Sequence, residues 1–296
     1  DTGGAVASGF DGIPGIEVII LYPKGKVSAI QELQLTTQGK NITALEVEGT
    51  FDDCQEMVKT AFLDPSLKQY RNLTSANSIN VARWLPQSFY YFFAVQDLMK
   101  KRTPVPYVFS VPSGNFGNIC AGLVAHKMGL PIAHFIASTN TNDTFPRYME
   151  AGVFSPKPSV QTISNAMDVG NPSNFERIQK LFNYDLFKLK TICSAYAFSD
   201  KETRSAMTEV YIDLNYITDP HGAVGYLGLK EYMKSHHDVQ GVFLETAHPV
   251  KFLDIVEQTL KQKVEIPQQI QDILDKKPTK RPVKSYEDLK EILVKS

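Results

Sequence analysis

Residues 108–122 read VFSVPSGNFGNICAG and decide the fold class. Their first four residues form an apolar run typical of a buried strand, and an apolar helix is expected to begin after a loop that contains Gly114 and Gly117. A loop at the start of a helix presents backbone N–H groups that have no partner inside the helix, and such groups favour a bound phosphate. The two glycines would let a ligand approach the backbone closely.

The same loop has a second interpretation. Ser113, Asn115 and Asn118 offer further hydrogen-bonding groups, which suits a ligand but also suits an ordinary cap of a strand-to-helix turn. The loop lacks the GK[ST] ending of a Walker A sequence and the GxGxxG spacing of a dinucleotide-binding loop. From these residues alone, a phosphate site and a simple glycine-rich turn both remain open.

On both sides of this segment, short apolar runs alternate with longer segments of helical period, which predicts an α/β fold with parallel sheets covered by helices. The expected strands are residues 16–22, 42–47, 107–111, 132–137 and 241–245. The expected helices are residues 26–38, 50–62, 79–100, 116–128, 143–150, 174–183, 200–214, 222–236, 249–260 and 285–295. Thr50 and Asp53 have the spacing of a capping box.

A change of composition at residues 100–106, which contain two prolines, predicts the main domain boundary. We expect a smaller β/α domain over residues 1–97 and a larger α/β domain over residues 98–262. Residues 263–296 are rich in lysine and proline and are expected to form a helical appendage. A ligand is expected where the carboxyl ends of strands meet the starts of helices.

Composition restricts the class of partner. The 296 residues include 31 basic and 32 acidic side chains, so the net charge of −1 predicts neither a nucleic acid nor a membrane surface as partner. The 43% of hydrophobic residues can form a large core, but no run approaches the roughly 20 apolar residues of a membrane span. Cys54, Cys120 and Cys193 are too few for a disulfide scaffold, which predicts a reducing, cytoplasmic location. The pair His236-His237 lacks a third ligand, so no metal site is expected.

Two further segments carry candidate binding groups. Ser78, Asn80 and Arg83 lie at the start of an expected helix and could bind an oxyanion, although a polar cap beside a solvated arginine is the alternative. Thr246 follows an expected strand, and its hydroxyl could bind a heteroaromatic nitrogen without charging it; here a strand-end cap is the alternative. His221, at another helix start, could act as a cap alone.

Seven motifs taken together resemble the threonine synthases of the longer bacterial and fungal type, which are fold-type-II enzymes that use pyridoxal 5′-phosphate. The resemblance extends from residue 1 to about residue 262 and implies two three-layer αβα domains, of which the N-terminal part is missing. The motifs are DTGGAVASGF (1–10), YPKGKVSAIQELQ (22–34), NSINVAR (77–83), PSGNFGNICAG (112–122), SNAMDVGNPSNFER (164–177), DPHGAVG (219–225) and TAHPVKF (246–252).

The resemblance also implies roles for individual residues. The cofactor phosphate would be held by the loop residues Gly114, Asn115, Phe116 and Asn118. Thr246 would face the pyridine nitrogen, and Asp1 would be the partner of the 3′-oxygen of the cofactor. The substrate carboxylate would be held by Thr2, and the substrate phosphate by Ser78, Asn80 and Arg83.

Enzymes of this family convert O-phospho-L-homoserine and water to L-threonine and phosphate by β,γ-elimination and replacement. Their Schiff-base lysine precedes the motif with which this sequence begins, and Lys24, Lys26 and Lys251 lie at positions with other roles. We therefore expect a C-terminal fragment that has no catalytic lysine and is inactive alone. A threonine or serine dehydratase is the alternative within the fold, disfavoured by NSINVAR and TAHPVKF, and a non-catalytic homologue that binds the cofactor or another ligand is the alternative outside enzymes.

Overall fold

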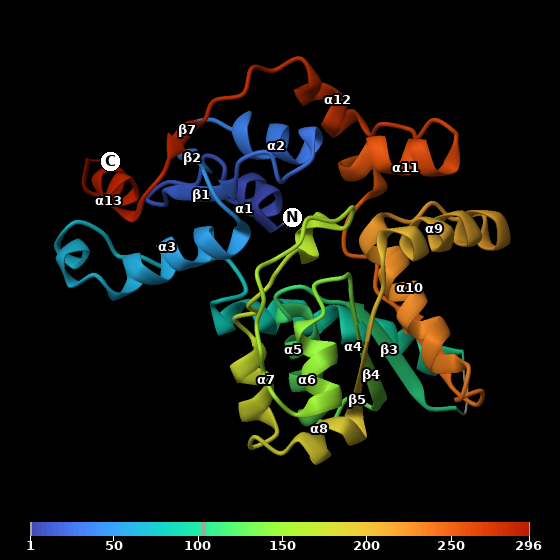
Figure 1. Cartoon of the computed structure of the whole chain (residues 1–296). Coiled ribbons are helices and arrows are strands. Elements are labelled where there is room, and N and C mark those ends of the chain that lie inside the picture. The colour runs from blue at the N-terminus through green and yellow to red at the C-terminus, as the bar shows by residue number, and fades with distance from the viewer. Residues whose placement is uncertain (1, 102–104, 296) are drawn as a thin grey trace. The chain divides into compact units, whose positions relative to one another are not determined.

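The computed structural model describes residues 2–101 and 105–295 and divides the chain into two compact units (Figure 1). The first unit consists of Asp1–Asn77, Val250–Leu253 and Val264–Ser296, and the second of Ser78–Pro249 and Asp254–Lys263. Within the described ranges, no helix has both the length and the apolar content that crossing a membrane requires.

A three-stranded parallel sheet forms the centre of the first unit. Its middle strand is β2 (Ile42–Val47), which lies between β1 (Val18–Pro23) and β7 (Arg281–Val283). In the register of these pairs, Val18 lies opposite Ile42 and Leu45 lies opposite Arg281. The last part of the chain therefore completes the sheet that the first part begins.

Side chains of β1 and β2 alternate between two apolar clusters, as the two-residue period of a strand requires. Ile20 and Tyr22 pack on one face with side chains of α1 and α2, while Leu45 and Val47 pack on the other face with side chains of α3 and α13. These helices are α1 (Thr2–Phe10), α2 (Ala29–Thr36), α3 (Phe51–Leu63) and α13 (Tyr286–Lys295). The unit thus has helices on both faces of its sheet.

Side-chain caps explain where two of these helices begin. Thr50 accepts a hydrogen bond from the backbone N–H of Asp53, and the Asp53 carboxylate accepts one from the Thr50 N–H at 2.7 Å. This reciprocal pair confirms the predicted capping box and satisfies donors that the first helical turn leaves open. Ser28 and Gln31 form the same arrangement at the start of α2.

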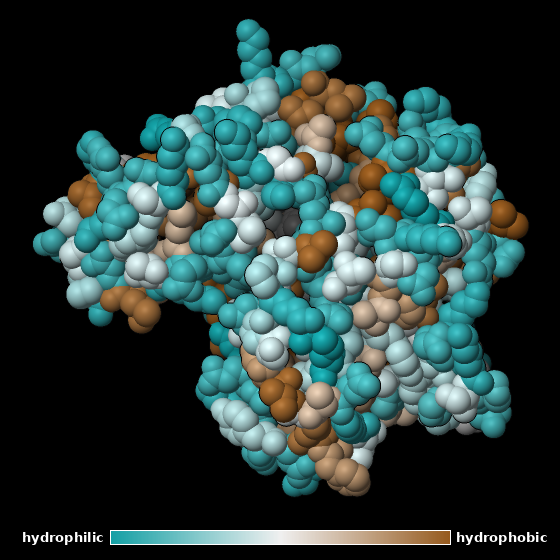
Figure 2. Space-filling model, viewed as in Figure 1, coloured by the Kyte–Doolittle hydropathy of each residue, from teal (hydrophilic) through white to brown (hydrophobic). Residues whose placement is uncertain are grey.

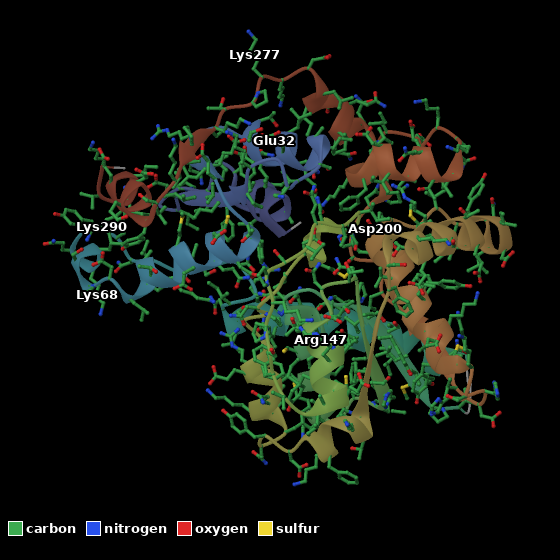
Figure 3. The ribbon with its side chains drawn as sticks, in the orientation of Figure 1. Glu32, Lys68, Arg147, Asp200, Lys277 and Lys290 are labelled. Carbon is green, nitrogen blue, oxygen red and sulfur yellow. The ribbon has the colours of Figure 1, made fainter. Side chains whose placement is uncertain are left out.

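Residues 264–296 are part of the first unit, whereas the sequence predicted an appendage over 263–296. The side chain of Ile270 on α12 (Gln268–Leu274) packs in one cluster with Ile30 and Val250. Lys280 pairs with Glu32 at 2.6 Å and with Glu46 at 2.7 Å, and Lys290 pairs with Asp64 at 2.8 Å; Figure 3 labels Glu32 and Lys290. The strand in this segment, β7, has only three residues, and one of them is proline. So short a run shows no alternation of apolar and polar residues, and the sequence therefore did not predict it.

The substitution Leu289→Ala is expected to destabilise the first unit by about 2–5 kcal/mol, because Leu289 on α13 is only 2% exposed and its loss leaves a cavity. Leu274→Ala on α12 is the matched control, since Leu274 is 41% exposed and its loss should cost under about 0.5 kcal/mol. Urea denaturation followed by circular dichroism measures both. Equal stabilities for the two variants would mean that α13 is not part of the core.

The second unit contains a four-stranded parallel sheet with the order β5-β4-β3-β6. The strands are β3 (Tyr107–Pro112), β4 (Ile132–Thr139), β5 (Cys193–Ala197) and β6 (Gln240–Phe243). In this register Phe109 lies opposite Phe135 on β4 and opposite Val242 on β6. The strand that precedes the glycine-rich loop is therefore paired on both sides.

Alternate residues of β3 face two layers of helices. Phe109 and Val111 pack in the large cluster with side chains of α4 (Trp84–Lys100) and α5 (Gly117–Lys127), whereas Val108 packs with side chains of α10 (Pro220–Met233). Helices therefore cover both faces of the sheet, and the two parallel sheets confirm the predicted α/β class. The remaining helices are α6 (Thr144–Ala151), α7 (Phe175–Leu181), α8 (Leu186–Ile192), α9 (Asp200–Leu214) and α11 (Leu253–Leu260).

Glycines at every third position allow α10 to lie directly on the sheet. A Cβ atom on Gly228 would come within 1.8 Å of the Ser138 hydroxyl oxygen on β4. The carbonyl of Gly225 accepts a hydrogen bond of 2.6 Å from the hydroxyl of Ser110 on β3. This close approach fixes the start of α10 at the carboxyl edge of the sheet, where its first turn can take part in a site.

The division between the units falls between Asn77 and Ser78, whereas the sequence predicted a boundary at residues 97–98. The predicted position lies inside α4, which packs against α5 and so belongs with the second unit. The helix expected from residue 79 begins at Trp84, after a short 3-10 turn over Val81–Arg83. The strands β5 and β7 and the helices α8 and α12 are among the elements that the sequence did not predict.

Some large apolar side chains remain exposed on separate elements. Leu63 is 82% exposed, Phe187 79% and Ile212 71%. On the face that Figure 2 shows, small apolar groups are scattered across a mainly hydrophilic surface. All three cysteines, in contrast, are buried free thiols. Burial raises the pKa of Cys54 and of Cys193 to about 12, so these thiols are unreactive at neutral pH.

Candidate functional site

The loop between β3 and α5 is the candidate phosphate site. Phe116, the residue before α5, has a φ of 62°, and this left-handed turn leads from the loop into the helix. No hydrogen bond to another described residue is found for the backbone N–H groups of residues 114–118. These donors lie at the positive end of an apolar helix, which is the arrangement that binds phosphate groups.

Two glycines let neighbouring parts of the protein pack closely against this loop. A Cβ on Gly114 would lie 2.6 Å from the Cα of Met167 and 3.1 Å from the carbonyl oxygen of Ala166. A Cβ on Gly117 would lie 2.5 Å from the Cβ of Ser78. Because the obstacle at Gly114 is backbone, a side chain there could not be accommodated by rotating a neighbour. The space beside Gly114 is thus filled by the backbone of Met167, and the space beside Gly117 by the side chain of Ser78.

Asn115 joins three segments of the second unit. Its amide nitrogen donates a 2.7 Å hydrogen bond to the hydroxyl of Ser78, and its side-chain oxygen accepts from the N–H of Ser173 at 2.7 Å. The Asn174 side chain donates to the backbone carbonyl of Asn115 at 2.8 Å. With its side chain engaged on both atoms, Asn115 shapes the loop and offers a ligand its backbone N–H.

Phe116 and Asn118 likewise offer a ligand their backbone rather than their side chains. Phe116 is 3% exposed and its ring packs against that of Phe145, with centroids 4.7 Å apart. The Asn118 side chain donates to the carbonyl of Pro112 at 2.7 Å, and its oxygen accepts from the N–H of Ile119 at 2.9 Å. The side chains of Asn115, Phe116 and Asn118 are thus engaged within the protein, and the backbone N–H groups of the loop are the donors left for a ligand.

Arg177 is a site residue that the sequence did not single out. Its guanidinium donates to the carbonyl of Ser78 at 2.9 Å and also to the carbonyl of Ile79. It lies over the ring of Trp84, with 5.5 Å from its central carbon to the ring centroid. Arg177 therefore holds residues 78–79 beside the glycine-rich loop. The sequence feature that could have identified Arg177 is its position as the last residue of the motif SNAMDVGNPSNFER.

The residues predicted to bind the substrate phosphate lie in the second unit, and one of them, Ser78, contacts the loop. Ser78 is joined to Asn115, and Asn80 caps the 3-10 turn by accepting a 3.0 Å hydrogen bond from the N–H of Ala82. Arg83 is half-buried at the start of α4, where burial lowers the pKa of its guanidinium while Tyr90 partly offsets that effect. The guanidinium still remains charged at neutral pH and is poorly solvated, which strengthens its attraction to an anion.

A buried polar network holds Met167 against the loop. Asn140, at the end of β4, donates to the carboxylate of Asp168 at 2.9 Å, and Asp168 also accepts from the N–H of Thr162 at 2.9 Å. Burial raises the pKa of Asp168 to about 6, although its hydrogen bonds from Thr162 and Asn140 oppose the shift. These contacts fix the segment whose backbone faces Gly114.

Thr246 lies at the same edge of the sheet as the loop. It follows β6, the direct neighbour of β3, and the N–H of Leu244 donates to the carbonyl of Ser110 at 3.0 Å. Thr246 is exposed, and its hydroxyl makes no hydrogen bond with any other residue that the structure describes. The strand-end cap that was its alternative interpretation is therefore not formed.

The other predicted positions lie elsewhere or outside the described residues. Asp1 is not described, and Thr2 is the first residue of α1 in the first unit. In the described parts of the chain, no group of three or more His, Cys, Asp or Glu side chains could hold a metal ion. An open pocket of about 500 Å³ lies between α9 and α11, and none of the predicted site residues lines it.

Two family models match the sequence. Residues 1–243 match the model described as pyridoxal-phosphate dependent enzyme, and residues 222–293 match the model described as threonine synthase, C-terminal. The two matches overlap at α10 and together reach almost to the end of the chain.

Several threonine synthases are similar to the chain. That of Buchnera aphidicola subsp. Acyrthosiphon pisum is 46% identical over 93% of this chain, which spans 63% of that relative's length. The crystal structure from Escherichia coli has a TM-score of 0.94 at 42% identity, covering 99% of this chain and 68% of that one. The pyridoxal-phosphate-bound structure from Brucella melitensis has a TM-score of 0.85 at 34% identity, covering 99% and 68%. The chain belongs to the threonine synthase family of pyridoxal-phosphate-dependent enzymes.

Proposed function

We propose that this chain supplies the cofactor and substrate pocket of a threonine synthase. The reaction would convert O-phospho-L-homoserine and water to L-threonine and phosphate, with pyridoxal 5′-phosphate as cofactor. The chain spans less than two thirds of the length of the curated relatives that it matches, so we propose the activity for the chain together with the part that those relatives have in addition.

One observation carries the proposal. The open N–H groups of residues 114–118 follow β3, the exposed hydroxyl of Thr246 follows β6, and these two parallel strands are neighbours in one sheet. The same edge of the sheet in the second unit therefore carries N–H donors for a phosphate and a neutral hydroxyl for a ring nitrogen. This donor set fits a phosphorylated pyridine, whose two polar ends need those two kinds of partner.

The cofactor, when bound, supplies an electron sink for carbanions of the substrate. The residues of this chain would hold and orient it. The N–H groups of residues 114–118 and the start of α5 would bind its phosphate dianion. The hydroxyl of Thr246 would donate a hydrogen bond to the pyridine nitrogen and keep its proton, so that nitrogen would remain uncharged. Gly114 and Gly117 would let Met167 and Ser78 pack against the loop and so hold its shape.

Arg83, with Ser78 and Asn80 beside it, would bind the substrate phosphate and stabilise its charge as it leaves. Asp1 would be the partner of the 3′-oxygen of the cofactor, and Thr2 would hold the substrate carboxylate. Proton transfer would be the task of the Schiff-base lysine, which the resemblance assigns to a segment before Asp1. The buried free thiols are compatible with a reducing compartment, and we propose the cytoplasm.

A chimera tests this function. The part of the Escherichia coli threonine synthase that precedes the matched region is joined ahead of Asp1, and phosphate and threonine are measured after addition of O-phospho-L-homoserine. We expect the chimera to release both products in equal amounts, and the 296-residue chain alone to release neither, because the lysine is supplied by the added part.

Each further outcome of that assay has a meaning. Turnover by the 296-residue chain alone would contradict the expectation that the catalytic lysine is supplied by the added part. A folded chimera that deaminates threonine or serine but leaves O-phospho-L-homoserine intact would favour the dehydratase alternative. A folded chimera that binds the cofactor and turns over no substrate would favour a non-catalytic homologue.

A further inference from the structure

A carboxyl group lies against the start of α10, directly before Thr246. Glu245 follows β6, and its Oε1 accepts a 2.5 Å hydrogen bond from the hydroxyl of Thr218. A Cβ on Gly222, in the first turn of α10, would come within 2.1 Å of that same oxygen. The Glu245 carboxyl therefore occupies the space that a glycine in α10 leaves free, although the residue as a whole is exposed.

Beside it lies a second carboxylate that is completely buried. Asp219 is 0% exposed, and its Oδ1 accepts from the N–H of His221 at 2.8 Å and from the ring Nδ1 at 2.6 Å. Its other oxygen, Oδ2, receives no hydrogen bond from an N–H or a hydroxyl of the described residues. A buried carboxylate oxygen without a donor is costly. A proton on Glu245 would remove that cost, because the acid could donate to Asp219 Oδ2.

The other end of this arrangement reaches the phosphate loop. The N–H of Ala166 donates to His221 Nε2 at 3.2 Å, so the ring carries its proton on Nδ1 and donates it to Asp219. Ala166 and Met167 are the residues whose backbone faces Gly114. A continuous series of contacts thus leads from the residue beside Thr246 to the loop at Gly114.

We propose that Glu245, Asp219 and His221 form a proton-sharing chain that positions Thr246 relative to the glycine-rich loop, and that this chain is intact only while Glu245 holds its proton. These three are positioning residues, because they act through Thr246 and through the segment at Ala166. Loss of the proton from Glu245 would leave Thr246 and the glycine-rich loop misplaced relative to each other. The affinity for a phosphorylated pyridine, which needs both, would then fall.

The surrounding charges favour the protonated form of Glu245. Burial of its carboxyl group, together with the negative charge of Asp219, raises the pKa of Glu245 to about 9. Burial alone would raise the pKa of Asp219, but the hydrogen bonds that it accepts from the ring and the backbone N–H of His221 hold it below its usual value. Tyr216, whose pKa is raised by burial and by both carboxylates, and Asp168, which interacts with His221, are the other titratable groups nearby.

The inference rests on the proposed function, because its test measures binding of a cofactor analogue. The 296-residue chain and its Glu245→Gln variant are titrated with pyridoxine 5′-phosphate between pH 7.5 and 10, with quenching of the single tryptophan, Trp84, as the signal. The glutamine amide can donate to Asp219 at every pH. At pH 7.5 we expect both proteins to bind the analogue with equal affinity. At pH 10 about a tenth of Glu245 remains protonated, so the unchanged chain should bind about tenfold more weakly than Glu245→Gln.

The analogue and the tyrosine and lysine side chains also ionise in this pH range. Because that ionisation affects both proteins equally, its effect cancels in the ratio of the two dissociation constants. Parallel pH profiles of the two proteins would overturn the proton-sharing chain while leaving the cofactor site intact. Absence of binding by both folded proteins at pH 7.5 would overturn the proposed function, and the positioning role with it. Glu245→Ala should bind weakly at every pH, because it removes the donor altogether.

Thermal unfolding without ligand gives an independent measurement. A carboxyl whose pKa is higher in the folded chain contributes stability that is complete below its unfolded pKa of about 4.3 and is lost as the pH rises through the folded value. The midpoint of wild-type unfolding should therefore fall relative to Glu245→Gln between pH 7.5 and 10. A constant difference between the two midpoints would contradict the shared proton.

Discussion

Gly114→Val in the 296-residue chain is expected to weaken binding of pyridoxine 5′-phosphate by about 100-fold or more. Any side chain at this position meets the backbone of Met167, 2.6 Å from the Cβ, so the loop itself must move. Displacing two charge-assisted N–H donors from a phosphate forfeits about 1.5–3 kcal/mol each, which accounts for the expected loss. Quenching of Trp84, at the start of α4, measures the affinity.

The control for this variant is Gly39→Val. A Cβ on Gly39 would have no other atom within 4 Å, and the residue lies in the first unit, so the substitution should leave the affinity unchanged. Circular dichroism and thermal unfolding verify that both variants are folded. A folded Gly114→Val chain with wild-type affinity would show that the loop does not bind the phosphate.

Arg83→Ala in the chimera is expected to lower kcat/KM for O-phospho-L-homoserine by about 100- to 1000-fold. Removing the half-buried guanidinium leaves the substrate phosphate without its cation, and truncating one partner of such a pair costs about 2–5 kcal/mol. The loss should appear in kcat as well as in KM, since the charge on the phosphate increases as it leaves. Arg83→Lys should recover part of the loss, because an ammonium supplies the charge without the paired donors.

Arg204→Ala is the matched control. Arg204 is a partly buried arginine of the same unit, and its side chain donates to the hydroxyl of Thr259 at 2.6 Å. Both residues line the open pocket between α9 and α11, which contains none of the predicted site residues. This variant should keep its kcat/KM within about twofold of the unchanged chimera. Equal losses in both variants, or none in Arg83→Ala, would remove Arg83 from the substrate site.

Much of the fold could be predicted because periodicity is strong in buried elements. The run at β3 is apolar at almost every position, since helices cover both faces of its sheet, and such a run is conspicuous in a sequence. The capping pair Thr50 and Asp53 likewise fixed the start of α3. Local signals of this kind depend only on neighbours in the chain.

The elements that the sequence did not reveal are short or depend on distant partners. β5 is a five-residue edge strand, and β7 owes its strand conformation to pairing with β2, more than 230 residues earlier. The role of Glu245 depends on Asp219 and Gly222, which only the packing of α10 brings to it. The candidate phosphate loop could be predicted because its donors are consecutive in the chain, whereas Arg177 reaches residues 78–79 from a distant helix.

Comparing the affinities of the 296-residue chain for pyridoxine 5′-phosphate and for pyridoxine tests the central claim most directly. The two ligands share one ring and differ only in the phosphate, so their ratio isolates the contribution of residues 114–118. We predict at least about tenfold tighter binding of the phosphorylated form, the value of one charge-assisted hydrogen bond, and competition by inorganic phosphate. Equal affinities for the two ligands would contradict a phosphate site in this loop.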